Sequence, residues 1–463
     1  MNHTQTTDAP IDTRTAFLHP DCPDWRQLGP TEADAAIRAQ SQMVVAEEEA
    51  RRDLWSRGFT RRRMLQGGLM AGVAAFGSQL VTTQVSYAAP GTPDTGSLIV
   101  IFLRGGMDGL SVLVPAADQD FLSARPGIAV RENSGLIPFE RGFGLHPALG
   151  ALKPLLDQGR IAAVPAIATP DLSRSHFQAQ DCLERGGANG SSSQSGWLTR
   201  TLEQSGPGTT WRSVGAGNRL DRSLAGSPGA LVVPDLAGFD LSVDDSMLEA
   251  TRTALANLYT GLDHPLAAQT TLALTAAAEA HTMSTAEPEH TKRGYSDNRF
   301  SHDMATLATL IRANVGLRVG TINLGGWDMH TQLGTPDSGD MKNMLTELGG
   351  ALAAFFADLG PKADSTTVVV MSEFGRRVQQ NDSAGTDHGH GGLALVMGGG
   401  VRGGVHGKWD GLGAANLDQG DVPGSNDFRD LLGEVVMKRL GLSAGAAATV
   451  FPDWKVTPVG VMA

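Results

Sequence analysis

Cysteine is nearly absent from this chain, which has only Cys22 and Cys182 among its 463 residues. Cys22 lies ahead of a segment, residues 61–88, that has the features of a cleavable export signal. The processed chain would therefore keep one cysteine and could form no internal disulfide. We expect its stability to come from core packing or from a bound metal.

Aromatic residues and net positive charge are also scarce. Only 5% of the residues are aromatic, and 37 basic against 49 acidic side chains give a formal net charge of −12. A protein that binds nucleic acid needs a basic excess to neutralise phosphates, so this class is excluded. Glycine, with 58 residues, and hydrophobic side chains, at 41%, are abundant instead. This composition favours a large α/β domain with many tight turns over a disordered chain.

Near the N-terminus, three consecutive arginines at positions 61–63 precede a weakly hydrophobic stretch. That stretch, residues 67–87, is interrupted by glycines and polar residues, so it is a poor membrane span, and small residues follow at Ala88. The arrangement is similar to a twin-arginine export signal. We expect residues 1–88 to be a leader and residues 89–463 to be a periplasmic or secreted domain. The twin-arginine translocase would be its partner during export, with no stable membrane span after processing.

Within the expected domain, apolar runs rich in β-branched residues alternate with amphipathic stretches. The runs predict strands at 97–103, 161–167, 317–324, 366–371 and 393–397. The amphipathic stretches predict helices at 147–158, 175–185, 247–259, 267–283, 301–314, 339–359 and 427–440. Continuous apolar strands with helices between them indicate a mostly parallel sheet covered on both faces, which is a three-layer α/β/α sandwich. Residues 186–297 show helices without strands between them, and we expect a helical insertion or cap there.

Acidic residues and histidines collect at the ends of the predicted strands. Those residues are Asp108, Asp328, His330, Glu373, His388 and His390. Ligands bind outside the carboxyl ends of strands in an open α/β sheet, so we expect these side chains to meet. Asp328 with His330, and His388 with His390, are spaced two residues apart, which places both side chains on one side of an extended segment. Each pair could present two ligands to one metal ion.

The type of ligand narrows the metal. Carboxylate oxygens with imidazole nitrogens suit Zn, Mn or Fe, with Ca or Mg as alternatives, and the lack of thiolates argues against a structural zinc site. One or two such ions bridging a phosphate or sulfate ester would stabilise charge and activate a nucleophile. Each residue alone also has a structural explanation: a strand-end Asp commonly caps a helix, and Glu373 could form a surface salt bridge with Arg376 or Arg377. The coincidence of four clusters favours the metal site.

A separate polar segment follows the strand predicted at 161–167. It contains Ser173, Arg174 and Ser175 at the start of a predicted helix, where free backbone amides favour anions. Ser173 or Ser175 could be a nucleophile, with Arg174 binding the oxyanion. Both serines could equally be helix caps.

Several long blocks between Ser97 and Leu442 resemble one protein family. The blocks are LIVIFLRGGMDGLSVLVP, GFGLHPALGALKPLLDQGRIAAVPAI, SRSHFQAQD, VVVMSEFGRR, GTDHGHGGLALVMGGGVRGG and NDFRDLLGEVV. They resemble a bacterial family of exported proteins known as domain of unknown function 1501, itself similar to the alkaline phosphatase and sulfatase superfamily. The resemblance implies an α/β/α sandwich with a metal-bound Ser, Thr or formylglycine nucleophile that acts on phosphate or sulfate esters.

The resemblance also implies roles by position. Asp108 would be the first metal ligand, Asp328 with His330 the second group, Glu373 the third, and His388 or His390 the last. The segment from Ser173 to Ser175 would contain the nucleophile, and because it holds no cysteine, formylglycine chemistry is not expected. Two features depart from the superfamily pattern: Glu373-Phe374 stands where Asp-His is usual, and Asp328 lies closer to His330 than usual.

Two functions follow as expectations. The first is a metal-dependent hydrolase of phosphate or sulfate esters, acting on a small molecule or a polymer. The second is a catalytically silent relative that serves in binding or envelope assembly. A changed metal or a single-metal site fits either expectation.

Overall fold

The computed structural model describes residues 96–463, except 188–192, 242, 244, 260–264 and 287. All the described residues belong to one compact unit, Gly72–Ala463. The expected leader and its arginines lie outside the described residues. None of the described helices is both long enough and apolar enough to cross a membrane.

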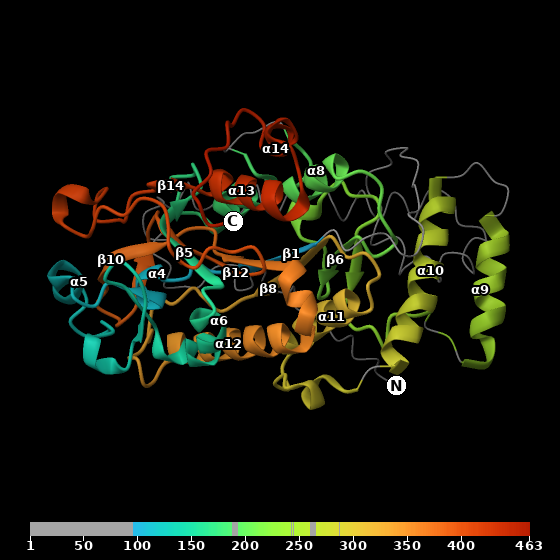
Figure 1. Ribbon diagram of the computed structural model, residues 1–463, viewed down its shortest axis with the longest axis horizontal. Helices are drawn as coiled ribbons and strands as arrows, with labels where there is room; N and C mark the ends of the chain where they lie inside the picture. Colours follow the sequence, from blue (N-terminus) through green and yellow to red (C-terminus); the bar gives the residue numbers. More distant parts are fainter. Residues whose placement is uncertain (1–95, 188–192, 242, 244, 260–264, 287) are drawn as a thin grey trace, which may run out of the picture. The chain divides into compact units, whose positions relative to one another are not determined.

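A large mixed sheet lies at the centre of this unit (Figure 1). Its strand order is β13-β5-β12-β9-β1-β8-β6-β7, with β14 paired to β5. The strands are β1 (Ser97–Leu103), β5 (Ile161–Ala168), β6 (Ser213–Ala216), β7 (Leu231–Val233), β8 (Val319–Leu324), β9 (Thr366–Met371), β12 (Gly392–Gly398), β13 (Gly404–Val405) and β14 (Asn426–Asp427). Of these strands, only β12 runs antiparallel to its neighbours, β5 and β9. The prediction of a mostly parallel sheet is confirmed.

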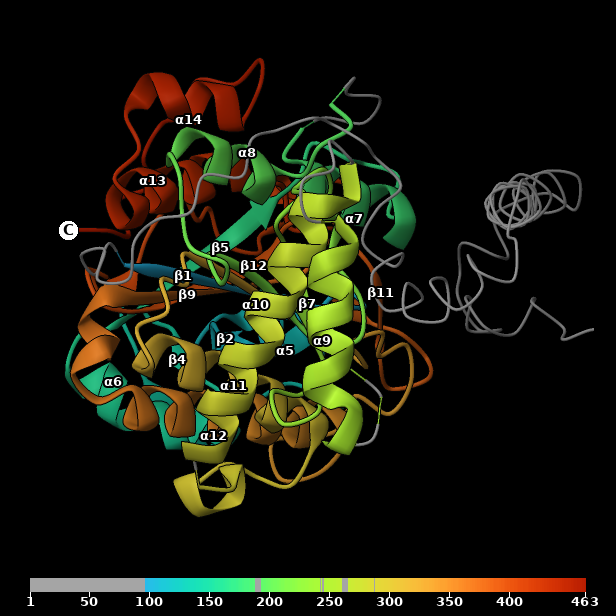
Figure 2. The same ribbon diagram turned by 90° about the vertical axis from the view of Figure 1, so that its right-hand side faces the viewer.

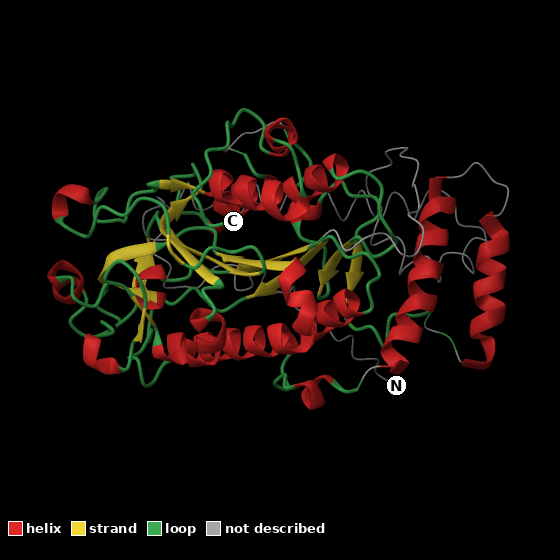
Figure 3. Cartoon of the chain, in the orientation of Figure 1, coloured by secondary structure: helices red, strands yellow, loops and turns green. Residues whose placement is uncertain are grey.

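Helices cover both faces of the sheet (Figure 3). The described helices are α4 (Gly109–Val112), α5 (Gln119–Ala124), α6 (Lys153–Asp157), α7 (His176–Arg185), α8 (Trp197–Gln204), α9 (Asp245–Tyr259), α10 (Pro265–Ala286), α11 (Arg299–Arg312), α12 (Asp340–Leu359), α13 (Phe428–Leu440) and α14 (Ala444–Val450). The helix predicted at 147–158 begins instead as a 3₁₀ segment, Pro147–Leu152, and continues as α6.

Strand β1 explains why two helical layers are needed. All seven of its residues are buried, and alternate side chains point to opposite faces. Ile99 and Ile101 pack in the core beneath α11 and α12, whereas Val100 and Phe102 pack in the core beneath α8 and α13. A strand that is apolar on both faces is stable only when both faces are covered.

The region 186–297 differs from its prediction. Strands β6 and β7 lie within it and extend the central sheet beyond β8, so the expectation that it lacks strands is wrong. These strands have only four and three residues, too short to show a periodic pattern. Helices α9 and α10 of the same region pack against each other (Figure 2).

Two small sheets complete the framework. Strands β10 (Arg376–Gln380) and β11 (Thr386–His388) form an antiparallel pair directly after β9, with Arg376 opposite His388. Strands β2 (Leu113–Val114), β4 (Gly144–Leu145) and β3 (Ile137–Pro138) form the other sheet. The pair of β10 and β11 lies beside the loops that follow β1 and β8, and it contributes to the site described next.

Candidate metal centre

The loops that carry the predicted site residues leave the same edge of the central sheet. Strands β1 and β8 run parallel to β9, and β5 runs in the same direction as β9 because both are antiparallel to β12. Their carboxyl ends therefore point the same way, as ligand-binding α/β sheets require. Helix α7 begins after β5, Asp328 and His330 follow β8, and Glu373 follows β9.

Four side chains converge here, and we call His176, Asp328, His330 and His388 the Asp328 cluster. Asp328 Oδ1 lies 3.0 Å from His330 Nε2 and 3.1 Å from His388 Nε2. The two histidine Nε2 atoms lie 3.0 Å from each other. Asp328 Oδ2 lies 3.5 Å from His176 Nε2. The predicted meeting of the β8 loop with His388 is present in the structure.

Partners on the far side of two rings fix their tautomers. His388 Nδ1 lies 2.9 Å from the Arg174 carbonyl oxygen, and His330 Nδ1 lies 3.2 Å from Asp387 Oδ1. A carbonyl and a carboxylate oxygen only accept, so each Nδ1 carries the hydrogen, as assigned from these partners. In the neutral rings, each Nε2 then has a lone pair directed at the cluster. Metal-bound histidines are oriented by the same kind of outer contact.

His176 has the same arrangement, although the sequence reasoning did not select it. Its Nδ1 lies 2.8 Å from Glu373 Oε1, which leaves Nε2 facing Asp328. The Nε2 atom is buried and, among the described residues, makes no well-formed hydrogen bond. The available signal was its position as the first residue of a helix after β5, directly beside Ser175.

The electrostatics of this ring are unusual for a histidine. Burial alone would lower the pKa of His176, but the carboxylates of Asp328 and Glu373 raise it to about 9. Burial would conversely raise the pKa of Glu373, and His176 lowers it to about 2. Burial would also raise the pKa of Asp328, but the three histidines hold it far below its usual range. Without a metal, His176 is therefore an imidazolium shared by two carboxylates.

The donor set fits a divalent cation. Ligand atoms of His176, Asp328 and His388 all lie within 4.8 Å of one another. Two ligands bound about 2.1 Å from one ion lie roughly 3.0–3.4 Å apart, close to the separations within the cluster. Two imidazole nitrogens and a carboxylate, with His330 beside them, suit Zn, Mn or Fe. A metal would take the place of the His176 proton, because ligating histidines must be neutral.

Glu373 supports the cluster from behind. Its Oε1 accepts from the Gly105 backbone N–H at 2.9 Å and from Gln180 at 2.8 Å, in addition to its contact with His176. The carboxylate is buried and forms no ion pair with an arginine among the described residues. The alternative of a surface salt bridge with Arg376 or Arg377 is therefore not found.

The segment before His176 holds the predicted nucleophiles. Ser173 Oγ donates to Asp171 Oδ2 at 2.7 Å, and Ser175 is the residue before α7 without a side-chain capping bond. Between them, Arg174 has a φ of 55°, in the left-handed region that non-glycine residues rarely adopt. This conformation accompanies the contact of its carbonyl with His388. Its guanidinium binds Asp421 Oδ2 through Nε, at 2.9 Å.

The sequence around this site matches a known family. Residues 146–432 match the model of a family described as protein of unknown function, DUF1501. That match spans more than half of the 463 residues. The chain belongs to the DUF1501 family. None of the curated proteins compared with it matches. The matched range includes every member of the Asp328 cluster and Glu373.

Three predicted ligands of this DUF1501 chain lie outside the Asp328 cluster, and the first is Glu373, which contacts His176 from behind. Asp108 forms a buried ion pair with Arg125. His390 Nε2 lies 3.0 Å from the Thr169 carbonyl oxygen. His388 and His390 were expected to point the same way, but β11 ends at His388 and Gly389 bonds back to Gly375, so the alternation stops there.

Proposed function

We propose that this DUF1501 protein is a metal-dependent hydrolase of phosphate or sulfate esters. One observation carries the proposal: the Nε2 atoms of His176, His330 and His388 converge on the Asp328 carboxylate at the ligand-binding edge of an α/β sheet. The mixed sheet between two helical layers supports an alkaline phosphatase-like fold. A cluster of perturbed titratable groups at such an edge is typical of a catalytic site.

The proposal gives each group a task. A bound divalent ion would supply Lewis acidity toward an ester oxygen. Asp328, His176 and His388 would hold it, and the Asp328 side chain, 30% exposed, opens the site to solvent. Ser175 is the better-placed nucleophile, because it precedes His176 and its hydroxyl makes no capping bond, whereas the Ser173 hydroxyl donates to Asp171. The Nη1 of Arg174, which makes no hydrogen bond to a described residue, would contact the oxyanion.

The cellular location belongs to the same proposal. A twin-arginine leader exports folded proteins, so a metal could be loaded before transport. We propose that residues 1–88 act as such a leader and that the domain works in the periplasm or outside the cell. The remaining acidic, cysteine-poor chain needs no disulfide for stability there.

A second candidate is a catalytically silent binding or envelope-assembly protein. The observation in its favour is that protonated His176 already lies within ion-pair distance of both Asp328 and Glu373. In such a cluster the proton on His176 already offsets the negative charge of the carboxylates, so no metal ion is needed. Metal binding by the purified protein separates the two candidates.

The decisive experiment is metal analysis followed by an ester assay. Purified processed protein is expected to contain a divalent ion and to hydrolyse an aryl phosphate or an aryl sulfate. Asp328→Asn and His388→Gln should each lose the ion, whereas His390→Gln is the matched control and should keep it. Protein that takes up no Zn or Mn and whose Tm ignores both ions would contradict the hydrolase. A bound ion with no turnover of either ester would favour the silent relative.

A further inference from the structure

Two buried arginines lie at carboxylates that were predicted to bind metal. Arg125 is 0% exposed and pairs with Asp108, and Arg376 is 2% exposed and pairs with Asp328. A guanidinium has five N–H donors in a fixed plane, so its bonding can be accounted for donor by donor. The donors and oxygens that remain open decide what else each arginine and each carboxylate can bind.

Arg125 uses all its donors within the chain. Its Nε donates to the Val378 carbonyl at 2.8 Å, and Nη2 donates to the Arg377 carbonyl at 2.9 Å and to Asp108 Oδ1 at 3.0 Å. Nη1 donates to Asp108 Oδ2 and to Ser111 Oγ. Both Asp108 oxygens are thus held by one guanidinium, and Oδ2 also accepts from Ser111 Oγ at 2.6 Å.

Arg376 is saturated in the same way. Its Nε donates to the Gly106 carbonyl at 2.5 Å, and Nη1 donates to the Thr386 carbonyl at 2.8 Å, with His330 Nε2 at 3.4 Å. Nη2 donates to the Gly105 carbonyl and to Asp328 Oδ1, the latter at 2.6 Å. No donor is left for a substrate, so Arg376 positions Asp328 and the loops after β1 and β8.

The two carboxylates differ in the oxygen that remains open. Arg125 engages both oxygens of Asp108, whereas the Arg376 bond goes to Oδ1 of Asp328 alone. Asp328 Oδ2 faces His176 instead and belongs to a side chain that is 30% exposed. Asp328 can therefore give an oxygen to an ion while it keeps its arginine, and Asp108 cannot.

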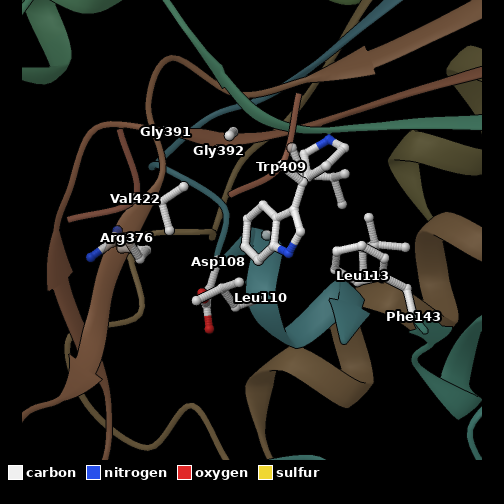
Figure 4. A pocket seen from close by; sticks show the side chains of 13 residues that line it. Asp108, Leu110, Leu113, Phe143, Arg376, Gly391, Gly392, Trp409 and Val422 are labelled. Carbon is white, nitrogen blue, oxygen red and sulfur yellow. The ribbon is translucent and has the colours of Figure 1, made fainter. Parts of the chain in front are cut away.

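The space beside Asp108 offers no second set of ligands. A small pocket lies there, with room for about one water molecule, and Asp108 and Arg376 are the charged residues among the described residues that line it (Figure 4). The labelled side chains opposite them include Leu113, Phe143 and Trp409. Among the described residues that line the pocket, none is a histidine. A divalent ion at Asp108 would have one ligand and two guanidinium groups as neighbours.

We infer that the centre holds a single divalent ion, bound by His176, Asp328 and His388. Arg125 and Arg376 supply permanent positive charges at this edge of the central sheet. Asp108 is then part of a structural ion pair and not a ligand. A dication placed between two buried guanidinium groups is strongly unfavourable where water cannot screen the charges. This inference rests on the metal site of the proposed function and fixes its stoichiometry.

Equilibrium dialysis against Zn²⁺ or Mn²⁺, with atomic absorption, tests the inference on the processed wild-type protein. We expect a saturating value of one ion per chain. Two ions per chain would overturn the inference while leaving a metal-dependent hydrolase in place. No bound ion would overturn the inference and the proposed function together.

Asp108→Asn and Asp328→Asn form a matched pair of variants. Asp108→Asn should keep one ion with unchanged affinity but lower the Tm, because Arg125 loses its charged partner. Asp328→Asn should weaken ion binding at least tenfold. A loss of ion content in Asp108→Asn, with a normal circular dichroism spectrum, would contradict the assignment. If Asp108→Asn fails to fold, Ser111→Ala removes one bond to Asp108 and should likewise leave the ion content at one.

Discussion

His330 Nε2 and His388 Nε2 face each other across 3.0 Å, and both lie about as close to Asp328 Oδ1. Each ring has its hydrogen fixed on Nδ1 by an acceptor on its far side. Arg376 N–H groups lie at Asp328 Oδ1 and His330 Nε2, and a proton or a metal ion between the two Nε2 atoms would relieve the remaining repulsion of their lone pairs. The residues that hold the far side of each ring should therefore affect metal binding as the rings themselves do.

Asp387 is the outer partner of His330, and its substitution should weaken metal binding without removing a ligand. Its Oδ1 receives the His330 Nδ1 hydrogen and is itself held by Asn381. In Asp387→Ala, the His330 ring loses the partner that holds it against Asp328, an expected ligand, and we expect metal affinity to fall by about 10–100-fold. Competition with a chelating dye measures this affinity.

Asp382→Ala is the matched control for this substitution. Asp382 is an exposed aspartate in the turn between β10 and β11, so its removal takes away the same charge without touching His330. The control should bind metal with the affinity of the wild-type protein. A comparable loss of affinity in both variants would mean that net charge, and not the orientation of His330, sets the affinity.

Substitution of Gly105 should disturb the metal site, because the Gly105 backbone lies directly against the loop that carries Asp328. Its φ is 123°, and a Cβ added there would lie 2.4 Å from the Asp328 backbone nitrogen. Gly105→Ala should displace that loop, lower metal affinity at least tenfold, and lower stability. Gly142→Ala is the control, since its φ is 79° but nothing lies within 4 Å of an added Cβ. That variant should lose only about 1–2 kcal/mol from backbone strain and keep its metal. Equal metal loss in both would refute the steric explanation.

Arg174 has separable backbone and side-chain roles. Both Arg174→Gly and Arg174→Ala remove the guanidinium, and we expect kcat/KM for the ester to fall at least tenfold in each, or about 1.4 kcal/mol. Only glycine tolerates the φ of 55° without strain, so Arg174→Gly should hold the carbonyl on His388 and keep the metal affinity. Arg174→Ala should bind metal more weakly than Arg174→Gly. Identical affinities would show that the carbonyl does not orient His388.

His146, which is not a member of the Asp328 cluster, should make stability depend on pH. Its Nδ1 accepts from the Ala148 backbone N–H at 3.1 Å, and burial lowers its pKa from 6.5 to about 4. The unfolded chain therefore binds a proton first, so stability is full above about pH 6.5 and is lost as the pH falls toward 4. His146→Asn keeps an acceptor but does not titrate. We compare the unfolding free energies of the wild-type protein and His146→Asn as the pH falls. Their difference should change by at most about 1.4 kcal/mol for each unit by which folding lowers the pKa of His146. A difference that stays constant from about pH 7 to about pH 4.5 would rule out His146 as the source.

Export should depend on the paired arginines. A reporter fused after residues 1–95 should reach the periplasm, and changing Arg61 and Arg62 to Lys should reduce the exported reporter at least tenfold. Activity in separated periplasmic and cytoplasmic fractions measures this. A reporter exported equally well by the Lys variant would exclude the twin-arginine route.

The amino-acid sequence is enough to predict the long strands and the edge of the sheet at which the polar residues collect. The strand at Thr366–Met371 was predicted to the residue, and β1 likewise, because a continuous apolar run bounded by glycine or polar residues has few alternatives. Asp328 and His330, which the two-residue spacing predicts to share one side, are 3.0 Å apart in the structure. Short strands such as β6 escaped prediction because their pairing partners lie far away in the chain.

Which strand-end residues meet depends on how distant segments pack together. Asp108 and Asp328 look alike in sequence, each on a glycine-rich turn after a strand, yet a buried arginine 17 positions along the chain engages both oxygens of Asp108. His176 looks like an ordinary helix start, yet it reaches Asp328 and Glu373 across the sheet. Local sequence sets the strands and turns, whereas contacts between distant segments depend on packing. An unpaired charge is costly when it is buried, so each buried charged side chain at this edge has a partner of opposite charge or a hydrogen bond.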